Sequence, residues 1–151
     1  MLISAGSVKV GNLGTVDASR RARTGGNDGA IEIMKRRILI IEDEVCLARN
    51  IKRYLTGVGF EARACHDGGS GLEEAEAFRP DIVLLDLQLP DMNGLVVLKR
   101  LRIVLPGARV IMLTACDNPR TEAEALGAGA CGYKLKPIAL DELRRTMVAV
   151  R

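Results

Sequence analysis

Short apolar runs alternate along the chain with longer segments whose apolar residues recur at helical spacing. The apolar runs predict five strands, at residues 38–41, 60–65, 82–86, 110–113 and 131–135. The amphipathic segments predict a helix after each strand, at residues 47–57, 72–78, 95–105, 119–126 and 140–151. Repeated strand–helix units are typical of α/β proteins, so we expect a (βα)5, doubly wound sheet of five parallel strands.

Polar residues that can carry chemistry stand where four of these strands end. They are Glu42 and Asp43 after the first strand, Asp86 at the end of the third, Thr114 after the fourth and Lys136 after the fifth. Open parallel sheets bind their ligands in the crevice at the carboxyl ends of the strands. We therefore expect these side chains to meet at that edge.

The acidic residues of this edge would repel one another on meeting. At an effective dielectric constant of about 20, two carboxylates about 4 Å apart cost about 4 kcal/mol. A divalent cation removes that cost, and oxygen ligands with room for water favour Mg²⁺. Taken alone, the acids at 42–44 fit a solvated loop or a first helical turn equally well. Lys136 alone fits a surface lysine, and Thr114 alone fits an ordinary strand residue.

Composition and charge narrow the class of protein. The 151 residues are 48% hydrophobic but only 3% aromatic, which predicts one domain with an aliphatic core. Residues 1–36 carry six basic and three acidic side chains, whereas residues 37–151 carry sixteen of each. The basic character of the chain therefore comes from its first 36 residues, and we expect no direct nucleic-acid binding by the folded part.

Cysteine spacing and hydropathy indicate the compartment. The four cysteines are far apart and form no CxxC motif, which predicts reduced thiols rather than a zinc or redox site. No segment has the roughly 18–20 apolar residues of a membrane span. The pattern of a signal peptide is also missing from the sequence. We therefore expect a cytoplasmic protein with no membrane partner.

Residues 1–36 differ in composition from the rest of the chain, because they are rich in Gly, Ser, Asn, Thr and Arg. They predict a flexible basic leader before a folded domain at 37–151. Met34 lies just before the first strand, so one hypothesis makes it the natural start and 1–33 an upstream extension. The alternative is a basic arm that binds a partner. The intact mass of the protein made from its own locus distinguishes the two.

Four separated motifs resemble the receiver domain of two-component response regulators. They are ILIIEDE at 38–44, PDIVLLDLQLPDMNG at 80–94, VIMLTA at 110–115 and GAGACGYKLKP at 127–137. The resemblance covers residues 37–151 and implies the flavodoxin-like receiver fold of the CheY-like family. It also implies a function in a phosphorelay, in which a histidine kinase or a phosphotransfer protein donates a phosphoryl group. Such a domain is a phosphoacceptor and a switch rather than an enzyme.

The resemblance assigns a phosphoacceptor and a metal site. Asp86 matches the aspartate that receives the phosphoryl group. Asp43 matches the acid that binds Mg²⁺ directly, and Glu42 matches its neighbour, which usually acts through water. Gln88 lies where a backbone carbonyl completes the metal ligands, so its side chain is free for that role.

The resemblance also assigns the groups that respond to phosphorylation. Thr114 matches the hydroxyl that hydrogen-bonds the phosphoryl group, and Lys136 matches the ammonium that pairs with it. Tyr133 falls at the aromatic switch position and would turn inward from an exposed position when Thr114 moves. The alternative is a plain strand tyrosine whose ring is half-buried. The fourth helix, fifth strand and fifth helix would form the surface that changes, and a homodimer through that surface is a candidate assembly.

Gln88 and Cys116 flank the expected phosphorylation pocket, at positions that often tune dephosphorylation in this family. A thiol cannot position an attacking water as an amide or a carboxylate can, so Cys116 predicts slow self-hydrolysis of the phosphoryl group.

Two other classes of protein are alternatives to a receiver domain. An aspartate-based phosphohydrolase would carry a second Asp two residues after the nucleophile, where this chain has Gln88. A receiver-like adaptor would signal without phosphorylation, and the complete set of strand-end residues argues against it. The sequence leaves two forms open, a stand-alone receiver or a fragment of a longer regulator.

Overall fold

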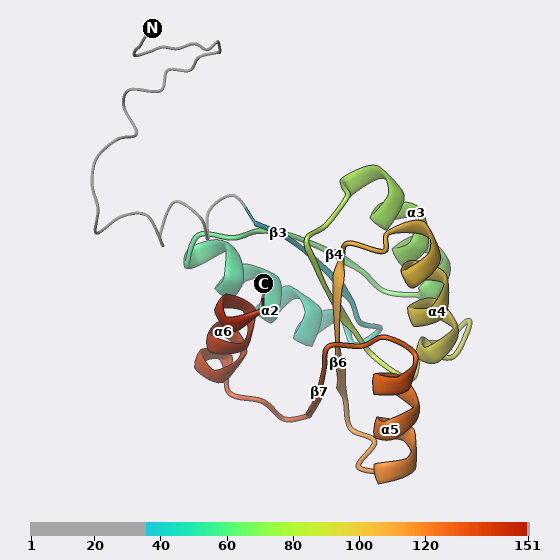
Figure 1. Ribbon diagram of the computed structural model, residues 1–151. Helices are drawn as coiled ribbons and strands as arrows, with labels where there is room; N and C mark the ends of the chain where they lie inside the picture. Colours follow the sequence, from blue (N-terminus) through green and yellow to red (C-terminus); the bar gives the residue numbers. More distant parts are fainter. Residues whose placement is uncertain (1–35, 151) are drawn as a thin grey trace, which may run out of the picture. The chain divides into compact units, whose positions relative to one another are not determined.

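Five strands alternate with five helices in the computed structural model, which describes residues 36–150 (Figure 1). The strands are β3 (Arg37–Ile41), β4 (Glu61–Cys65), β5 (Ile82–Leu85), β6 (Arg109–Thr114) and β7 (Gly132–Leu135). The helices are α2 (Val45–Gly57), α3 (Gly68–Phe78), α4 (Gly94–Val104), α5 (Pro119–Gly127) and α6 (Leu140–Ala149). The predicted leader, apart from Arg36, and the start-site hypothesis at Met34 lie outside the described residues.

The strands form one parallel sheet in the order β4-β3-β5-β6-β7, which confirms the predicted (βα)5 fold. The chain runs from β3 outward to β4 and then returns to β5 on the other side of β3. The direction of winding therefore reverses between β3 and β5, and a switch point of this kind opens a crevice at the carboxyl ends of the two strands.

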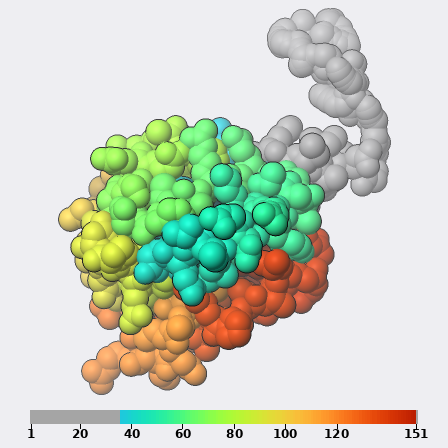
Figure 2. Space-filling view, turned by 180° about the vertical axis from the view of Figure 1, so that it is seen from behind, coloured from blue at the N-terminus to red at the C-terminus, as the bar shows by residue number. Residues whose placement is uncertain are grey.

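Helices cover both faces of the sheet. Side chains of α3, α4 and α5 join one buried cluster with Leu39 and Ile41 of β3. Because side chains alternate along a strand, Ile38 and Ile40 point to the opposite face, where α2 and α6 lie. Figure 1 shows the two groups of helices on either side of the sheet, and in Figure 2 the red of α6 borders the teal and green of α2. Burial on both faces explains why the strands are continuous apolar runs.

The observed strands begin and end within one residue of the predicted bounds, and the differences have local causes. Phe60 was predicted to begin the second strand, but its N–H donates to the carbonyl of Leu55 at 3.0 Å and closes the end of α2 instead. Asp86 was predicted to end the third strand and is the residue after β5, although its N–H still donates to Ile41 at 3.0 Å. The backbone hydrogen bonds between β3 and β5 therefore extend to Asp86, whose side chain lies at the carboxyl edge of the sheet.

The core is aliphatic, as the low aromatic content predicted. Isoleucine and leucine are the largest fully buried side chains of residues 36–150, and β3 and β5 supply most of those from the sheet. Over the same residues, no helix has both the length and the apolar content needed to cross a membrane.

Candidate functional site

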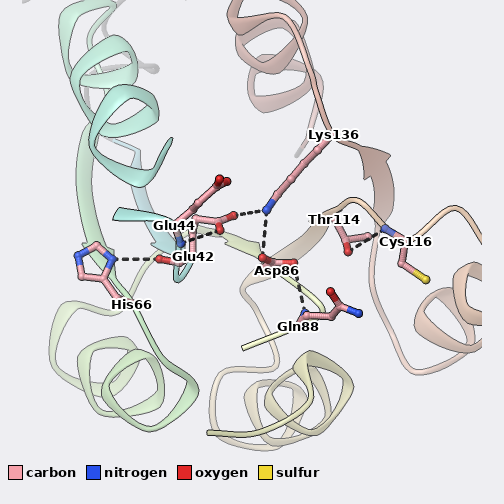
Figure 3. Close-up of polar contacts among 8 residues, drawn as sticks. All are labelled: Glu42, Glu44, His66, Asp86, Gln88, Thr114, Cys116 and Lys136. Carbon is pink, nitrogen blue, oxygen red and sulfur yellow. Dashed lines mark hydrogen bonds and ion pairs between the residues drawn. The ribbon is translucent and has the colours of Figure 1, made fainter. Parts of the chain in front are cut away.

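The carboxyl edge of the sheet brings together most of the residues predicted from the sequence (Figure 3). Glu42 follows β3 and Asp86 follows β5, so the two lie side by side across the switch point. Thr114 ends the neighbouring strand β6. Lys136 follows β7, and Figure 3 shows its side chain reaching across to both acids.

Three acidic side chains converge at this edge. Glu42, Asp43 and Asp86 each offer a carboxylate oxygen, and these oxygens all lie within 4.8 Å of one another. Glu42 and Asp86 are only 2% and 5% exposed, whereas Asp43 is exposed to solvent. The cluster therefore has two buried members and one that opens to water.

Lys136 supplies the positive charge of the cluster. Its Nζ lies 2.7 Å from Oε1 of Glu42 and 3.0 Å from Oδ2 of Asp86. Burial alone would lower the pKa of Lys136, but its hydrogen bonds to the two carboxylates outweigh burial and raise it. The lysine is therefore charged and bridges the two buried acids, which excludes the surface-lysine alternative.

Glu42 is fixed by neighbours on both sides. Its Oε2 accepts a hydrogen bond from the N–H of Glu44 at 3.0 Å, and its backbone carbonyl lies 3.0 Å from Nδ1 of His66. Burial raises the pKa of Glu42 to about 7, although the hydrogen bond from Lys136 acts in the opposite direction. Even beside Lys136, Glu42 is therefore only partly ionised at neutral pH, and a further cation at the cluster would favour its charged form.

Asp86 also contacts the loop that follows it, residues 87–93. The N–H of Gln88 donates to Oδ1 of Asp86 at 3.3 Å, so both carboxylate oxygens have a partner. The loop is closed at its base, because the N–H of Gly94 donates to the carbonyl of Leu87 at 2.6 Å. A side chain at Gly94 would place its Cβ 2.2 Å from the carbonyl oxygen of Asp86, so only glycine fits there.

Thr114 and Tyr133 meet through the backbone of Cys116. The Thr114 hydroxyl, which is almost fully buried, accepts from the N–H of Cys116 at 3.2 Å. The Tyr133 hydroxyl donates to the carbonyl of Cys116 at 2.7 Å. Burial, helped by this hydrogen bond, raises the pKa of Tyr133 to about 12.

The positions of Tyr133 and Thr114 bear on their expected roles. The side chain of Tyr133 is half-buried and packs against the apolar cluster of the sheet, which fits the alternative of a plain strand tyrosine rather than an exposed ring. Thr114 bonds Cys116 in this structure, so its contact with a phosphoryl group stays a prediction. The role of Tyr133 as a switch also stays a prediction.

Sequence reasoning missed one residue near the site. Asp91, in the loop that follows Asp86, accepts hydrogen bonds from the N–H groups of Gly68 and Gly69 at 2.7 and 2.8 Å. The signal in the sequence was the glycine-rich start of α3, whose free amides need acceptors. Asp81, just before β5, lies at the opposite edge of the sheet and accepts from the N–H of Arg37 at 2.8 Å.

Comparison with known proteins identifies relatives of the whole fold. Residues 38–148 match the family model of the response regulator receiver domain. The chain is 39% identical over 106 residues to the probable transcriptional regulatory protein TcrX of Mycobacterium tuberculosis, covering 70% of this chain and 45% of that protein. It is 38% identical over 113 residues to the DNA-binding response regulator MtrA of Mycolicibacterium smegmatis, covering 75% of this chain and 49% of that protein. The chain thus spans about half the length of these curated relatives.

Solved structures agree with the sequence relatives. A CheY-like response regulator receiver domain protein from Methanospirillum hungatei is 30% identical, with a TM-score of 0.72 over 74% of this chain and 90% of that one. A response regulator from Burkholderia pseudomallei, solved with a phosphorylated aspartic acid, a calcium ion and citrate, is 27% identical. Its TM-score is 0.70 over 73% of this chain and 65% of that one. The chain belongs to the response regulator receiver domain family.

Proposed function

We propose that Asp86 accepts a phosphoryl group, with Mg²⁺ held by Glu42, Asp43, Asp86 and the backbone carbonyl of Gln88. One observation carries the proposal. Asp86 is a buried carboxylate that pairs with Lys136 at 3.0 Å and lies within 4.8 Å of carboxylate oxygens of both other acids. A nucleophile, a cation and a set of metal ligands therefore meet at one strand end.

The charge and the chemistry of the acids fit a divalent ion. Three carboxylates face one ammonium, so the cluster lacks two positive charges when all of its groups are ionised. The ligands are all oxygen, and exposed Asp43 leaves room for water, a combination that suits Mg²⁺. When bound, Mg²⁺ would supply positive charge that offsets the repulsion between Asp86 and an anionic phosphoryl donor.

The proposed step is an in-line displacement at phosphorus. A carboxylate oxygen of Asp86 bonds to phosphorus, the bond between phosphorus and the donor's leaving group breaks, and that group departs with the electron pair. The product is an acyl phosphate on Asp86. Lys136 is close enough to pair with the phosphoryl oxygens, and the Thr114 hydroxyl would hydrogen-bond them after leaving the N–H of Cys116.

The proposal extends to the partners and the response. A receiver domain implies a kinase that supplies the phosphoryl group, here a histidine kinase directly or through a phosphotransfer protein. Phosphorylation would alter the surface formed by α5, β7 and α6, with Thr114 and Tyr133 as the moving residues, and a homodimer through that surface is one form of output. MtrA is named a DNA-binding response regulator, which supports an output in transcription for a longer protein.

The remaining proposals concern context and lifetime. We place the domain at residues 37–151, after a basic leader, in the cytoplasm. It would act as a regulatory switch rather than a catalyst of turnover. The side chain of Cys116 has no amide or carboxylate that could position an attacking water, so we expect slow self-dephosphorylation. An acyl-phosphate lifetime of only seconds, measured by intact mass after removal of the donor, would contradict that expectation.

The test of the phosphoacceptor is chemical. The protein is incubated with acetyl phosphate and Mg²⁺, and the gain of one phosphoryl group is followed by intact mass spectrometry. Asp86→Asn should abolish the gain, while the matched variant Asp81→Asn, at the opposite edge of the sheet, should retain it. Phosphate that still attaches to Asp86→Asn, or a wild-type protein that never gains it, would overturn the proposal.

A further inference from the structure

The loop at residues 87–93 is attached to α3 at its tip. Asp91 lies at that tip, and its two carboxylate oxygens accept from different backbone groups, Oδ1 from the N–H of Gly68 at 2.7 Å and Oδ2 from the N–H of Gly69 at 2.8 Å. These hydrogen bonds lower the pKa of Asp91, so the carboxylate is ionised at neutral pH. A charged side chain of one loop thus binds the start of a helix from another part of the chain.

The start of α3 is suited to this carboxylate. The first N–H groups of a helix have no partner within the helix, and the positive end of the helix dipole favours an anion there. Asp67 accepts from the N–H of Ser70 at 2.7 Å and caps the helix from within its own segment. Asp91 accepts from the N–H groups of the two residues before Ser70. The first three amides of α3 therefore all donate to carboxylates.

Two glycines of α3 allow the helix to approach the loop and the sheet closely. A Cβ at Gly68 would lie 2.6 Å from Cγ of Met92, the loop residue after Asp91. A Cβ at Gly71 would lie 2.6 Å from Cδ1 of Ile41, at the end of β3. The glycine run at 68–71 does not have the pattern of a phosphate-binding loop. Its glycines instead let the helix start pack against the phosphoacceptor loop and the sheet.

The same loop carries the groups closest to the proposed chemistry. Its base is closed by the Gly94–Leu87 hydrogen bond and by the bridge between Gln88 and Asn93. Gln88 therefore belongs to a base fixed by backbone bonds, and the loop tip beyond it is fixed by Asp91. Its N–H donates to Asp86, and its carbonyl is the one proposed to bind Mg²⁺.

We propose that Asp91 is a positioning residue, which fixes the loop tip to α3 and thereby holds the Gln88 carbonyl in place for Mg²⁺. This inference rests on the proposed function, because it assigns the Gln88 carbonyl to the metal. Asp91 touches neither the metal ligands nor the reacting atoms. It acts through the backbone of the loop, in the way that groups behind a metal site orient its ligands.

Two matched variants separate positioning from helix stability. Asp91→Ala and Asp67→Ala each remove a carboxylate that binds amides at the start of α3, but only Asp91 belongs to the loop. Mg²⁺ binding is measured by isothermal titration calorimetry with the metal alone. We expect the dissociation constant to rise roughly tenfold in Asp91→Ala and to change less than about twofold in Asp67→Ala. Asp91→Asn keeps one carbonyl oxygen as an acceptor and should fall between wild type and Asp91→Ala.

A second readout uses the metal-free protein. Amide hydrogen exchange at Gln88 should be faster in Asp91→Ala than in wild type and unchanged in Asp67→Ala. Equal effects of the two alanine variants, or an unchanged Gln88 in Asp91→Ala, would overturn the positioning role. If Asp91→Ala fails to fold, Asp91→Asn gives the same comparison. A wild-type protein that neither binds Mg²⁺ nor accepts phosphate would instead overturn the proposed function, and with it this role.

Discussion

The two edges of the sheet hold their charged side chains in different ways. At the amino edge, the guanidinium of Arg37 donates to the carbonyl of Arg79 at 3.0 and 3.2 Å, and Asp81 accepts from the backbone N–H of Arg37 at 2.8 Å. The guanidinium groups of Arg37 and Arg63 also lie over the ring of Phe78, at 5.6 and 4.3 Å from its centroid. Arg37, Arg63 and Asp81 therefore each have a partner within the fold.

At the carboxyl edge the charges do not balance. Glu42, Asp43 and Asp86 lie together, and the ammonium of Lys136 pairs with Glu42 and Asp86, the two acids that are almost fully buried. Like charges that are close and shielded from water raise the free energy of the folded protein. Charged side chains thus stabilise the structure at the amino edge, whereas the carboxyl edge keeps an excess of negative charge that a cation can neutralise.

The largest effect is expected from removing the ammonium of Lys136 at the carboxyl edge. Lys136→Met keeps the stem of the side chain but leaves Glu42 and Asp86 buried without a positive partner. Breaking a buried ion pair in this way should lower the free energy of unfolding by about 3 kcal/mol in metal-free protein. Urea unfolding with a chelator measures the loss, and Mg²⁺ should restore part of it. A loss below about 1 kcal/mol would mean that water screens the charges of the carboxyl edge.

Mg²⁺ itself should stabilise the wild-type protein through the same acids. At a hundred times its dissociation constant, a ligand that binds only the folded state adds about 2.7 kcal/mol to the free energy of unfolding. Thermal unfolding with and without Mg²⁺ measures this gain. Asp43→Asn, at the carboxyl edge, should remove most of the gain, and Asp81→Asn, at the amino edge, should keep it. Equal gains in both variants would place the metal elsewhere.

Tyr133 provides a smaller test, at high pH. Burial and the hydrogen bond to Cys116 raise its pKa from 10 to about 12, so the folded state holds the phenol proton more tightly than the unfolded state does. The resulting contribution to the free energy of unfolding is fully present below pH 10 and is lost as the pH rises toward 12. Because the side chain is only half-buried, we expect about 1 kcal/mol, measured as the loss in Tyr133→Phe at pH 8.

A spectroscopic titration checks the same group directly. The protein has two tyrosines, so in Tyr54→Phe the phenolate absorbance reports Tyr133 alone. We expect its midpoint near 12, or at the alkaline unfolding transition if that comes first. A midpoint near 10 in folded protein would show that the hydroxyl is not bonded to Cys116.

The smallest effect is expected at the amino edge. Arg37→Ala removes the guanidinium that bonds Arg79 and lies over Phe78, in a setting open to solvent. The free energy of unfolding should fall by about 1 kcal/mol or less. The loss should be the same with and without Mg²⁺, in contrast to Lys136→Met. A loss equal to that of Lys136→Met would remove the distinction between the two edges.

The fold and the site differ in how much of each was predictable from the sequence. Strand positions followed from apolar runs such as 38–41 and 82–85, because burial on both faces leaves a continuous hydrophobic signature. Asp86, Glu42 and Lys136 followed from their positions at strand ends, since a parallel sheet brings those ends to one edge. Their convergence at one edge needed only a parallel sheet, which the repeated units imply, whereas the structure supplied the strand order that sets β3 beside β5.

The contacts that escaped prediction all join residues far apart in the sequence. The hydrogen bond from Tyr133 to Cys116 and the contact of Asp91 with Gly68 both depend on how separate loops and strands pack together. No periodicity encodes such contacts, because they arise from tertiary packing.

The most direct measurement is the position of the phosphoryl group. The protein is treated with acetyl phosphate and Mg²⁺, the acyl phosphate is reduced with borohydride, and the modified aspartate is located by peptide mass spectrometry. We expect the modification at Asp86 alone. Modification at Asp43 or Asp91, or at any residue once Asp86 is replaced by asparagine, would contradict the assignment of Asp86 as the phosphoacceptor.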